Sequence, residues 1–199
     1  MAIVIGLTGS IATGKSTVSG ILKEQGLPIV DADQISRIVV EPGERAYQGI
    51  VDTFGEEVLY EDGTLDRKKL GSIVFTDESK REQLNAIVHP EVRRKMLEMR
   101  DEYVKKGYRA VVMDIPLLFE SRLTHFVDQT VVVYVGEETQ LKRLMERDNS
   151  SGEEALQRIH SQLSIEKKAE MADAVINNEG TVQETSEQVH ELLRKWEII

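Results

Sequence analysis

The stretch LTGSIATGKST, from Leu7 to Thr17, fits the phosphate-binding-loop (P-loop) pattern of glycine, four residues, glycine, lysine and serine or threonine. The residues that match the pattern are Gly9, Gly14, Lys15 and Ser16. An apolar run at 2–7 precedes the loop, and apolar residues recur at helical spacing over 17–22. The stretch therefore predicts a buried strand, then a glycine-rich loop, then a helix.

The residue types in this loop suit a bound polyphosphate. Gly9 and Gly14 are expected to let the backbone take positive φ and lie close to phosphate, while N–H groups and the helix dipole face the anion. Lys15 is expected to reach the β- and γ-phosphates, and the Ser16 hydroxyl to bind Mg²⁺, which bridges the same phosphates. The alternative, a glycine-rich turn with a solvated lysine, leaves the flanking strand and helix unexplained.

The composition is that of an acidic globular protein. The 199 residues are 40% hydrophobic and 30% charged, with a formal net charge of -10, so one sizeable core is expected and disorder is not. A non-specific nucleic-acid or anionic-membrane binder needs a basic surface. We therefore expect no nucleic-acid or membrane partner, and any phosphate site must be a local concentration of basic residues.

The numbers and positions of cysteine and histidine limit which disulfides and metal sites the chain can form. The chain has no cysteine, which excludes disulfides and cysteine zinc sites, and its four histidines are too scattered for metal-ligand spacing. No stretch approaches the roughly 20 apolar residues of a membrane span, and no basic region precedes the short N-terminal apolar run. A cytoplasmic location is expected.

Strand-like and helix-like segments alternate along the chain. This alternation predicts a three-layer α/β fold with a five-stranded parallel sheet and right-handed crossovers. The expected strands are residues 2–7, 28–30, 110–114, 130–135 and 174–177, and a closing helix runs over 182–196.

A helical insertion is expected between the second and third strands. Helices are predicted over 46–54, 66–75 and 78–88, with a longer one beginning near Pro90. The chain thus divides into a core (about 1–40, 107–141 and 164–199), an insertion (about 41–106) and a helical lid (about 142–163). In a P-loop kinase, such an insertion would hold the acceptor substrate.

Carboxylates follow two of the expected strands. Asp31 and Asp33 come after the second strand, and Asp114 ends the third in the manner of a Walker B acid that could hold Mg²⁺. Asp33 has an equally good alternative role as the N-cap of the next helix. One of the two aspartates can cap the helix while the other serves the reaction.

Basic and apolar residues near the lid also have two interpretations each. Arg143 and Arg147 lie four residues apart, on one face of the predicted helix. They either bind phosphate or form a solvated basic face that pairs with Glu146 or Asp148. The turn after the third strand either exposes an apolar cluster or packs Leu117 and Leu118 into the core.

A GTPase switch is a competing class of P-loop protein. The DTFG sequence at 52–55 matches the short D-x-x-G pattern. It stands at the end of a predicted helix rather than a strand, and no N-K-x-D element for guanine recognition is present. Guanine- against adenine-nucleotide binding distinguishes the two classes.

In the order and spacing of its motifs, the chain resembles the dephospho-CoA kinase family over nearly its whole length. The matching fragments are LTGSIATGKST, VDADQISR (30–37), VVEPG (39–43), FGEEVLYEDGTLDR (54–67), NAIVHP (85–90), IPLLFE (115–120), TQLKRLMERD (139–148) and ADAVINN (172–178). The resemblance implies ATP-dependent, Mg²⁺-assisted phosphorylation of the ribose 3′-hydroxyl of dephospho-CoA, the last step of coenzyme A biosynthesis. A nucleoside or nucleotide kinase is the alternative on the same scaffold, and either would be a monomer or small homo-oligomer.

The resemblance also implies roles for individual residues. Asp33 is expected to be the base, with Lys15 and Arg143 completing the catalytic set. ATP binding is expected at Gly9, Ala12, Thr13, Gly14, Lys15, Ser16, Thr17, Arg143 and Arg147. The acceptor is expected at Asp31, Arg37, His89, Leu117 and Glu120, and the metal at Ser16 and Asp114.

Two features qualify these assignments. The family loop commonly reads GGIGSGKS, and here Ser10, Ala12 and Thr13 replace two glycines and a serine. We expect altered loop rigidity with ATP binding retained. His89 also has a structural alternative, because it precedes Pro90 at an expected helix start.

Overall fold

The structure is a computed structural model that describes residues 2–199. Its residues form two compact units. The first comprises the chain up to Val30 together with Arg100–Ile199, and the second comprises Asp31–Met99. Helix α5 (Glu78–Lys105) belongs in part to each unit.

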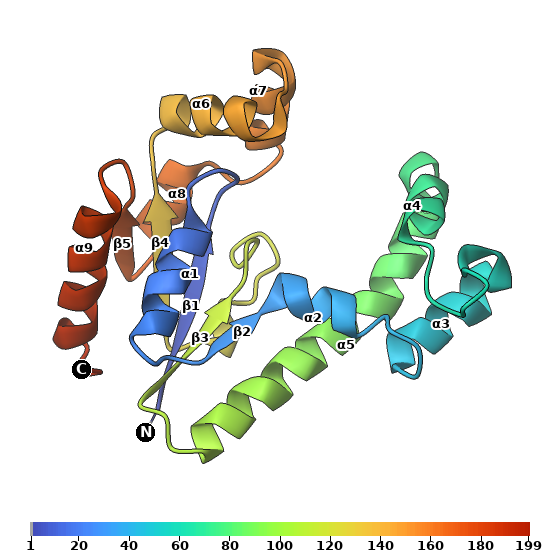
Figure 1. The fold of residues 1–199 in the computed structure, drawn as a ribbon, viewed down its shortest axis with the longest axis horizontal. Helices are drawn as coiled ribbons and strands as arrows, with labels where there is room; N and C mark the ends of the chain where they lie inside the picture. Colours follow the sequence, from blue (N-terminus) through green and yellow to red (C-terminus); the bar gives the residue numbers. More distant parts are fainter. Residues whose placement is uncertain (1) are drawn as a thin grey trace. The chain divides into compact units, whose positions relative to one another are not determined.

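A five-stranded sheet with the order β2-β3-β1-β4-β5 organises the first unit (Figure 1). Strand β1 pairs in parallel with β3 and β4, and β5 pairs in parallel with β4. The strands are β1 (Ile3–Gly9), β2 (Ile29–Asp31), β3 (Ala110–Asp114), β4 (Gln129–Tyr134) and β5 (Ala174–Asn177). The predicted α/β fold with a five-stranded parallel sheet is confirmed, and the strands fall within two residues of their expected bounds.

Helices cover both faces of this sheet, which gives the three predicted layers. On one face, α1 (Lys15–Glu24) and α9 (Val182–Lys195) lie side by side (Figure 1) and pack on Leu7, Val133 and Ile176. Trp196 packs against this cluster as a partly buried side chain. On the other face, α8 (Ile165–Met171) packs against β4, where Ile165 contacts Val132 and Phe119.

Two further helices lie beyond the sheet, where the lid was predicted. These are α6 (Glu137–Asp148) and α7 (Gly152–His160), which pack on one another through Leu144, Ala155 and Ile159. Met145 of α6 is 37% exposed. A capping box at Ser151 and Glu154 begins α7 and ends the polar turn between the helices.

The second unit is helical. It contains α2 (Ala32–Ile38), α3 (Arg45–Phe54), α4 (Arg67–Thr76), the short 3₁₀ turn η1 (Glu56–Val58) and the larger part of α5. A second 3₁₀ turn, η2 (Thr124–Phe126), belongs to the first unit. Gly49 of α3 lies close to Ile87 of α5: a Cβ at Gly49 would lie 2.9 Å from Ile87 Cγ2.

The predicted helix start at Pro90 is wrong. Residues 78–88 and the segment after Pro90 form a single helix of 28 residues, α5, with Pro90 in its interior. Proline lacks an N–H and so withholds one bond from the carbonyl of Ala86. The remaining hydrogen bonds of so long a helix outweigh this loss.

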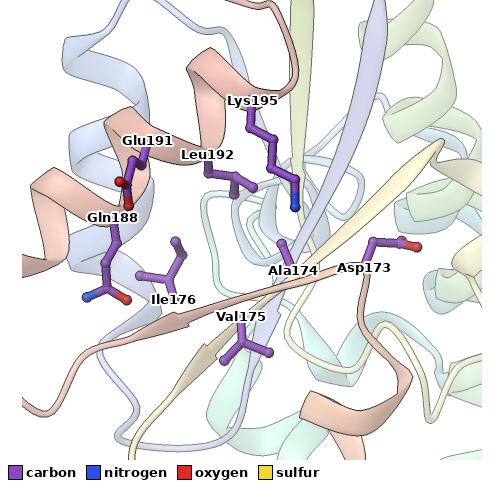
Figure 2. A pocket seen from close by; sticks show the side chains of 8 residues that line it. All are labelled: Asp173, Ala174, Val175, Ile176, Gln188, Glu191, Leu192 and Lys195. Carbon is purple, nitrogen blue, oxygen red and sulfur yellow. The ribbon is translucent and has the colours of Figure 1, made fainter.

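The sheet edge at β5 is partly closed by α9. The Gln188 side chain accepts a hydrogen bond from Asn177 N at 2.9 Å and donates one to Asn177 O at 2.8 Å, as a neighbouring strand would. An open groove continues along β5 and α9 (Figure 2). It is lined by Asp173, Ala174, Val175, Ile176, Gln188, Glu191, Leu192 and Lys195.

Within residues 2–199, no helix combines the length and the apolar character that crossing a bilayer requires.

Gly6 of β1 provides a test of this packing. A Cβ at Gly6 would lie 2.9 Å from Leu118 Cδ2 and 3.0 Å from Val127 Cγ2 on the far face of the sheet. We expect Gly6→Ala to lower the free energy of unfolding by about 1–3 kcal/mol, because a closely packed interior cannot absorb an added methyl. Denaturant unfolding measures the change.

Gly20→Ala is the matched control. Gly20 lies inside α1 with no atom within 4 Å of an added Cβ. The same substitution there should raise stability by about 0.5–1 kcal/mol, because alanine has the better helix propensity. Equal effects at the two glycines would contradict the packing described for β1.

Candidate active site

The phosphate loop joins β1 to α1 at the carboxyl edge of the sheet. Gly14 is the N-cap of α1, with φ 83°, and an added Cβ would overlap the side-chain amide of Asn178. The other positive φ in the loop is at Ala12, at 62°. The expectation of positive φ at Gly9 is wrong: Gly9 is an extended residue of β1, and glycine is needed there because a Cβ would collide with Thr13 Oγ1.

Side chains bind the carbonyl oxygens of the phosphate loop. Lys168 Nζ donates to Gly9 O at 3.0 Å, Gln140 Nε2 to Ile11 O at 2.8 Å, and Asn178 Nδ2 to Thr13 O at 2.9 Å. Thr13 Oγ1 donates to Ser10 O at 2.9 Å. With these carbonyls engaged, the N–H groups at the start of α1 remain oriented for an anion.

Lys15 and Asp114 meet beside the loop. Lys15 Nζ forms an ion pair and hydrogen bond with Asp114 Oδ1. Asp114 ends β3 opposite Leu7 of β1 and is only 4% exposed, so its carboxylate lies at the sheet edge from which the loop departs. The structure thus brings together two residues that the sequence analysis assigned to phosphate and to metal, and these assignments stay predictions.

The donor set around the loop fits Mg²⁺. Mg²⁺ prefers oxygen ligands and usually keeps several waters, with one or two protein oxygens and substrate phosphates completing its shell. The Asp114 carboxylate and the hydroxyl of Ser16, the exposed second residue of α1, supply such oxygens. Among residues 2–199, no group of three or more histidine, aspartate or glutamate side chains forms a self-contained metal cage.

An ion pair between a buried lysine and a more exposed glutamate supports the base of the loop. Lys168 of α8 has no exposed surface, and its Nζ lies 2.8 Å from Glu120 Oε1. Glu120 Oε1 also accepts from Leu163 N at 3.1 Å. Removing Glu120 would leave the Lys168 charge buried without its partner, a loss that typically costs about 3–5 kcal/mol. Glu120 is thus bound to Lys168 and to the backbone of Leu163, and its assignment to the acceptor stays a prediction.

The two lid arginines have different surroundings. Arg143 Nη2 donates to Asn178 O at 3.0 Å, and its Nη1 would lie 3.8 Å from a Cβ on Gly14, so the guanidinium is beside the loop. Arg147 instead forms an ion pair with Asp148 at 2.7 Å. Hydrogen bonds from Arg147 and Arg158 hold the pKa of Asp148 well below its ordinary value.

The loop after β5 anchors the helix that carries Arg143. Glu179 accepts hydrogen bonds from Gly136 N and Thr139 Oγ1 at the start of α6. These bonds, together with the charge of Arg143, lower the pKa of the Glu179 carboxyl. The segment that binds Thr13 O therefore also fixes the N-terminal end of α6.

The turn after β3 divides its two leucines. Leu118 is fully buried, whereas Leu117 is 41% exposed. The packing interpretation is therefore right for Leu118 and wrong for Leu117, because only Leu118 faces the sheet at Gly6. An exposed apolar side chain at Leu117 is compatible with its predicted role toward the acceptor, which stays a prediction.

The remaining predicted residues belong to the second unit. Asp31, not Asp33, caps α2: its Oδ1 accepts from Asp33 N at 2.8 Å and from Gln34 N at 3.0 Å. The capping role considered for Asp33 is thus wrong, because Asp31 occupies the extended N-cap position, and the Asp33 side chain is exposed. Arg37 lies near the end of α2.

His89 lies inside α5 rather than at a helix start, so the structural role proposed for it there is wrong. Burial, with a smaller contribution from the charge of Arg93, lowers the pKa of its imidazole. This favours the neutral form at physiological pH.

Several residues of the site escaped the sequence analysis. They are Gln140, Gln162, Lys168 and Asn178, all of which bind the loop or its supports. Gln140 and Asn178 stand inside fragments that the family resemblance covers, yet nothing in their spacing indicated a partner. Lys168 stands in the charged sequence IEKKAEM, which is typical of a solvated helix.

A phosphate loop at the carboxyl edge of a parallel sheet, with a lysine and a strand-end aspartate, defines a P-loop kinase fold. The fold recurs in shikimate kinase from Acinetobacter baumannii, with a TM-score of 0.54 and 17% identity over 100% of this chain and 97% of that one. At this identity the likeness concerns the fold alone.

Closer relatives identify the family. The family profile described as dephospho-CoA kinase matches residues 3–184. The dephospho-CoA kinase of Oceanobacillus iheyensis is 56% identical over 198 residues, covering 100% of both chains. The structure of dephospho-CoA kinase from Campylobacter jejuni has a TM-score of 0.75 and 31% identity over 98% of each chain. The chain belongs to the dephospho-CoA kinase family.

Proposed function

We propose that this protein transfers the γ-phosphoryl group of ATP to the ribose 3′-hydroxyl of dephospho-CoA, forming CoA and ADP. The proposal rests above all on the family match over residues 3–184, which supplies the acceptor. The phosphate loop, with Lys15 beside Asp114, is compatible with the donor. Mg²⁺ held by Ser16 and Asp114 would neutralise charge on the phosphates.

Lys15 has two partners in this proposal. Lys15 is paired with Asp114. In the proposed reaction its ammonium group also stabilises charge on the β- and γ-phosphates, and the Asp114 carboxylate would be one of the ligands that hold Mg²⁺. The loop N–H groups and the N-terminus of α1 stabilise the same charge.

Asp33 is the proposed general base. Its carboxylate accepts the proton of the ribose hydroxyl while the hydroxyl oxygen forms a bond to the γ-phosphorus. The bond from that phosphorus to the oxygen bridging to the β-phosphate breaks, and ADP leaves with the electron pair. Because Asp31 caps α2, Asp33 can serve this role without loss of the helix N-cap.

Arg143 is proposed to stabilise charge on the transferred group. Its position on α6 places the guanidinium beside Gly14, close to where the loop binds phosphate. Packing of α6 and α7 over the loop would also exclude water and limit ATP hydrolysis.

The acceptor is tested by coupled ADP release with ATP and Mg²⁺, comparing dephospho-CoA, adenosine, AMP and no acceptor. We expect ADP release that depends on dephospho-CoA, with a product heavier by one phosphate in the mass spectrum. Phosphorylation of adenosine or AMP instead would assign the protein to the nucleoside or nucleotide kinases. Nucleotide binding without transfer would favour a switch.

Asp33→Asn tests the base. Turnover should fall by roughly 10²- to 10⁴-fold, the usual contribution of a positioned base, while ATP affinity is unchanged. The melting temperature should also be unchanged, because the cap of α2 is Asp31. As the control, Asp31→Ala should lower stability by about 0.5–2 kcal/mol through loss of the cap. Near-normal turnover in Asp33→Asn would exclude Asp33 as the base.

Arg143→Ala and Arg147→Ala test the lid. Loss of a transition-state arginine costs roughly 10³- to 10⁵-fold in turnover, and we expect a loss of this order for Arg143 with little change in dephospho-CoA affinity. Arg147→Ala should lower turnover much less, because Arg147 is paired with Asp148. Single-turnover phosphate transfer measures both. A change confined to acceptor affinity in Arg143→Ala would contradict the assignment.

A further inference from the structure

One residue of the phosphate loop, Ile11, is hydrogen-bonded on both sides by glutamine side chains. Its N–H donates to Gln162 Oε1 at 2.9 Å, and its carbonyl accepts from Gln140 Nε2 at 2.8 Å. The backbone partners dictate the orientation of each amide, since an N–H requires an acceptor and a carbonyl requires a donor. Gln140 is 1% exposed, so its amide is committed to this contact.

These glutamines stand at the two ends of the α6–α7 pair. Gln140 lies in the first half of α6, one turn before Arg143, and Gln162 follows the end of α7. The segment between them contains the arginine beside Gly14. Ile11 is therefore bonded to both ends of the segment that carries Arg143.

The side chains of the loop reinforce the connection. Ile11 and Ala12 pack against the cluster formed by Leu144, Ala155 and Ile159 of α6 and α7. Ala12 has φ 62°, a strained conformation for a non-glycine residue that persists only where the surrounding structure holds it. The packed methyl group of Ala12 is such a restraint, which a glycine would lack.

We propose that Gln140 and Gln162 are positioning residues that fasten the phosphate loop to α6 and α7. Binding of phosphate to the loop and placement of Arg143 are then one event rather than two. The inference rests on the proposed use of the loop for ATP. It predicts that weakening either glutamine raises the KM for ATP and lowers kcat, while the KM for dephospho-CoA is unchanged.

The same substitution at the two glutamines gives opposite predictions. Glutamate at position 162 still presents an acceptor to Ile11 N, so Gln162→Glu should retain kcat and the KM for ATP within about threefold. An ionised glutamate at position 140 directs an oxygen at Ile11 O and donates nothing, so the assay is run at a pH high enough to keep this carboxyl ionised. Gln140→Glu should lower kcat/KM for ATP by roughly 10- to 100-fold, the consequence of an unpaired buried carbonyl.

Gln140→Met and Gln162→Met provide for the case in which a buried carboxylate prevents folding. Both keep the side-chain length without charge or hydrogen bond. We expect each to lower kcat/KM for ATP by roughly 5- to 100-fold with the KM for dephospho-CoA unchanged. Hydrogen exchange at the Ile11 amide and in residues 152–160, measured without acceptor, should speed up in Gln162→Met and not in Gln162→Glu.

Two results would overturn the proposal. One is wild-type kinetics with ATP in both methionine variants, whatever their exchange rates. The other is an equal loss in Gln140→Glu and Gln162→Glu when both are folded. Failure of the proposed function is a separate outcome, because it appears as absent CoA formation by the wild-type protein. The exchange measurements, repeated with Mg·ADP, do not depend on the acceptor.

Discussion

The conformation of the phosphate loop depends on hydrogen bonds that its carbonyl oxygens accept from distant side chains. Gly9, Ile11 and Thr13 each have a carbonyl that accepts from a side chain, namely that of Lys168, Gln140 and Asn178 respectively. These donors come from α8, from α6 and from the residue after β5. An unpaired buried carbonyl costs about 1–3 kcal/mol, so the loop conformation depends on segments more than a hundred residues away.

This dependence explains why so many polar groups are buried in the C-terminal half. Lys168 is fully buried beside Glu120, and Thr185 donates to Asn178 Oδ1 at 2.8 Å from inside α9. Buried polar side chains are tolerated when all their hydrogen bonds are made. The same contacts place α6 over the loop, so the elements that stabilise the loop also determine where Arg143 lies.

The residues assigned to the acceptor, unlike those around the phosphate loop, do not all belong to one unit. The residues assigned to the acceptor by resemblance are Asp31, Arg37 and His89 in the helical unit and Leu117 and Glu120 in the sheet unit. The proposed base, Asp33, also belongs to the helical unit. Within the helical unit, Asp31 caps α2 and leaves the Asp33 carboxylate on the exposed side. Two neighbouring carboxylates thus have separate tasks, one structural and one proposed to be chemical.

The sequence by itself determined the phosphate loop, the order and approximate bounds of the five strands, and the family, because these depend on local spacing and on short motifs. The position of Asp114 at a strand end also followed from the sequence, whereas its contact with Lys15 is a finding of the structure. Tertiary structure alone decided that α5 continues through Pro90, that Asp31 rather than Asp33 caps α2, and that Leu117 is exposed. It also decided the partners of Gln140, Gln162 and Lys168, because a hydrogen bond between residues far apart in the chain leaves no periodic pattern in the sequence.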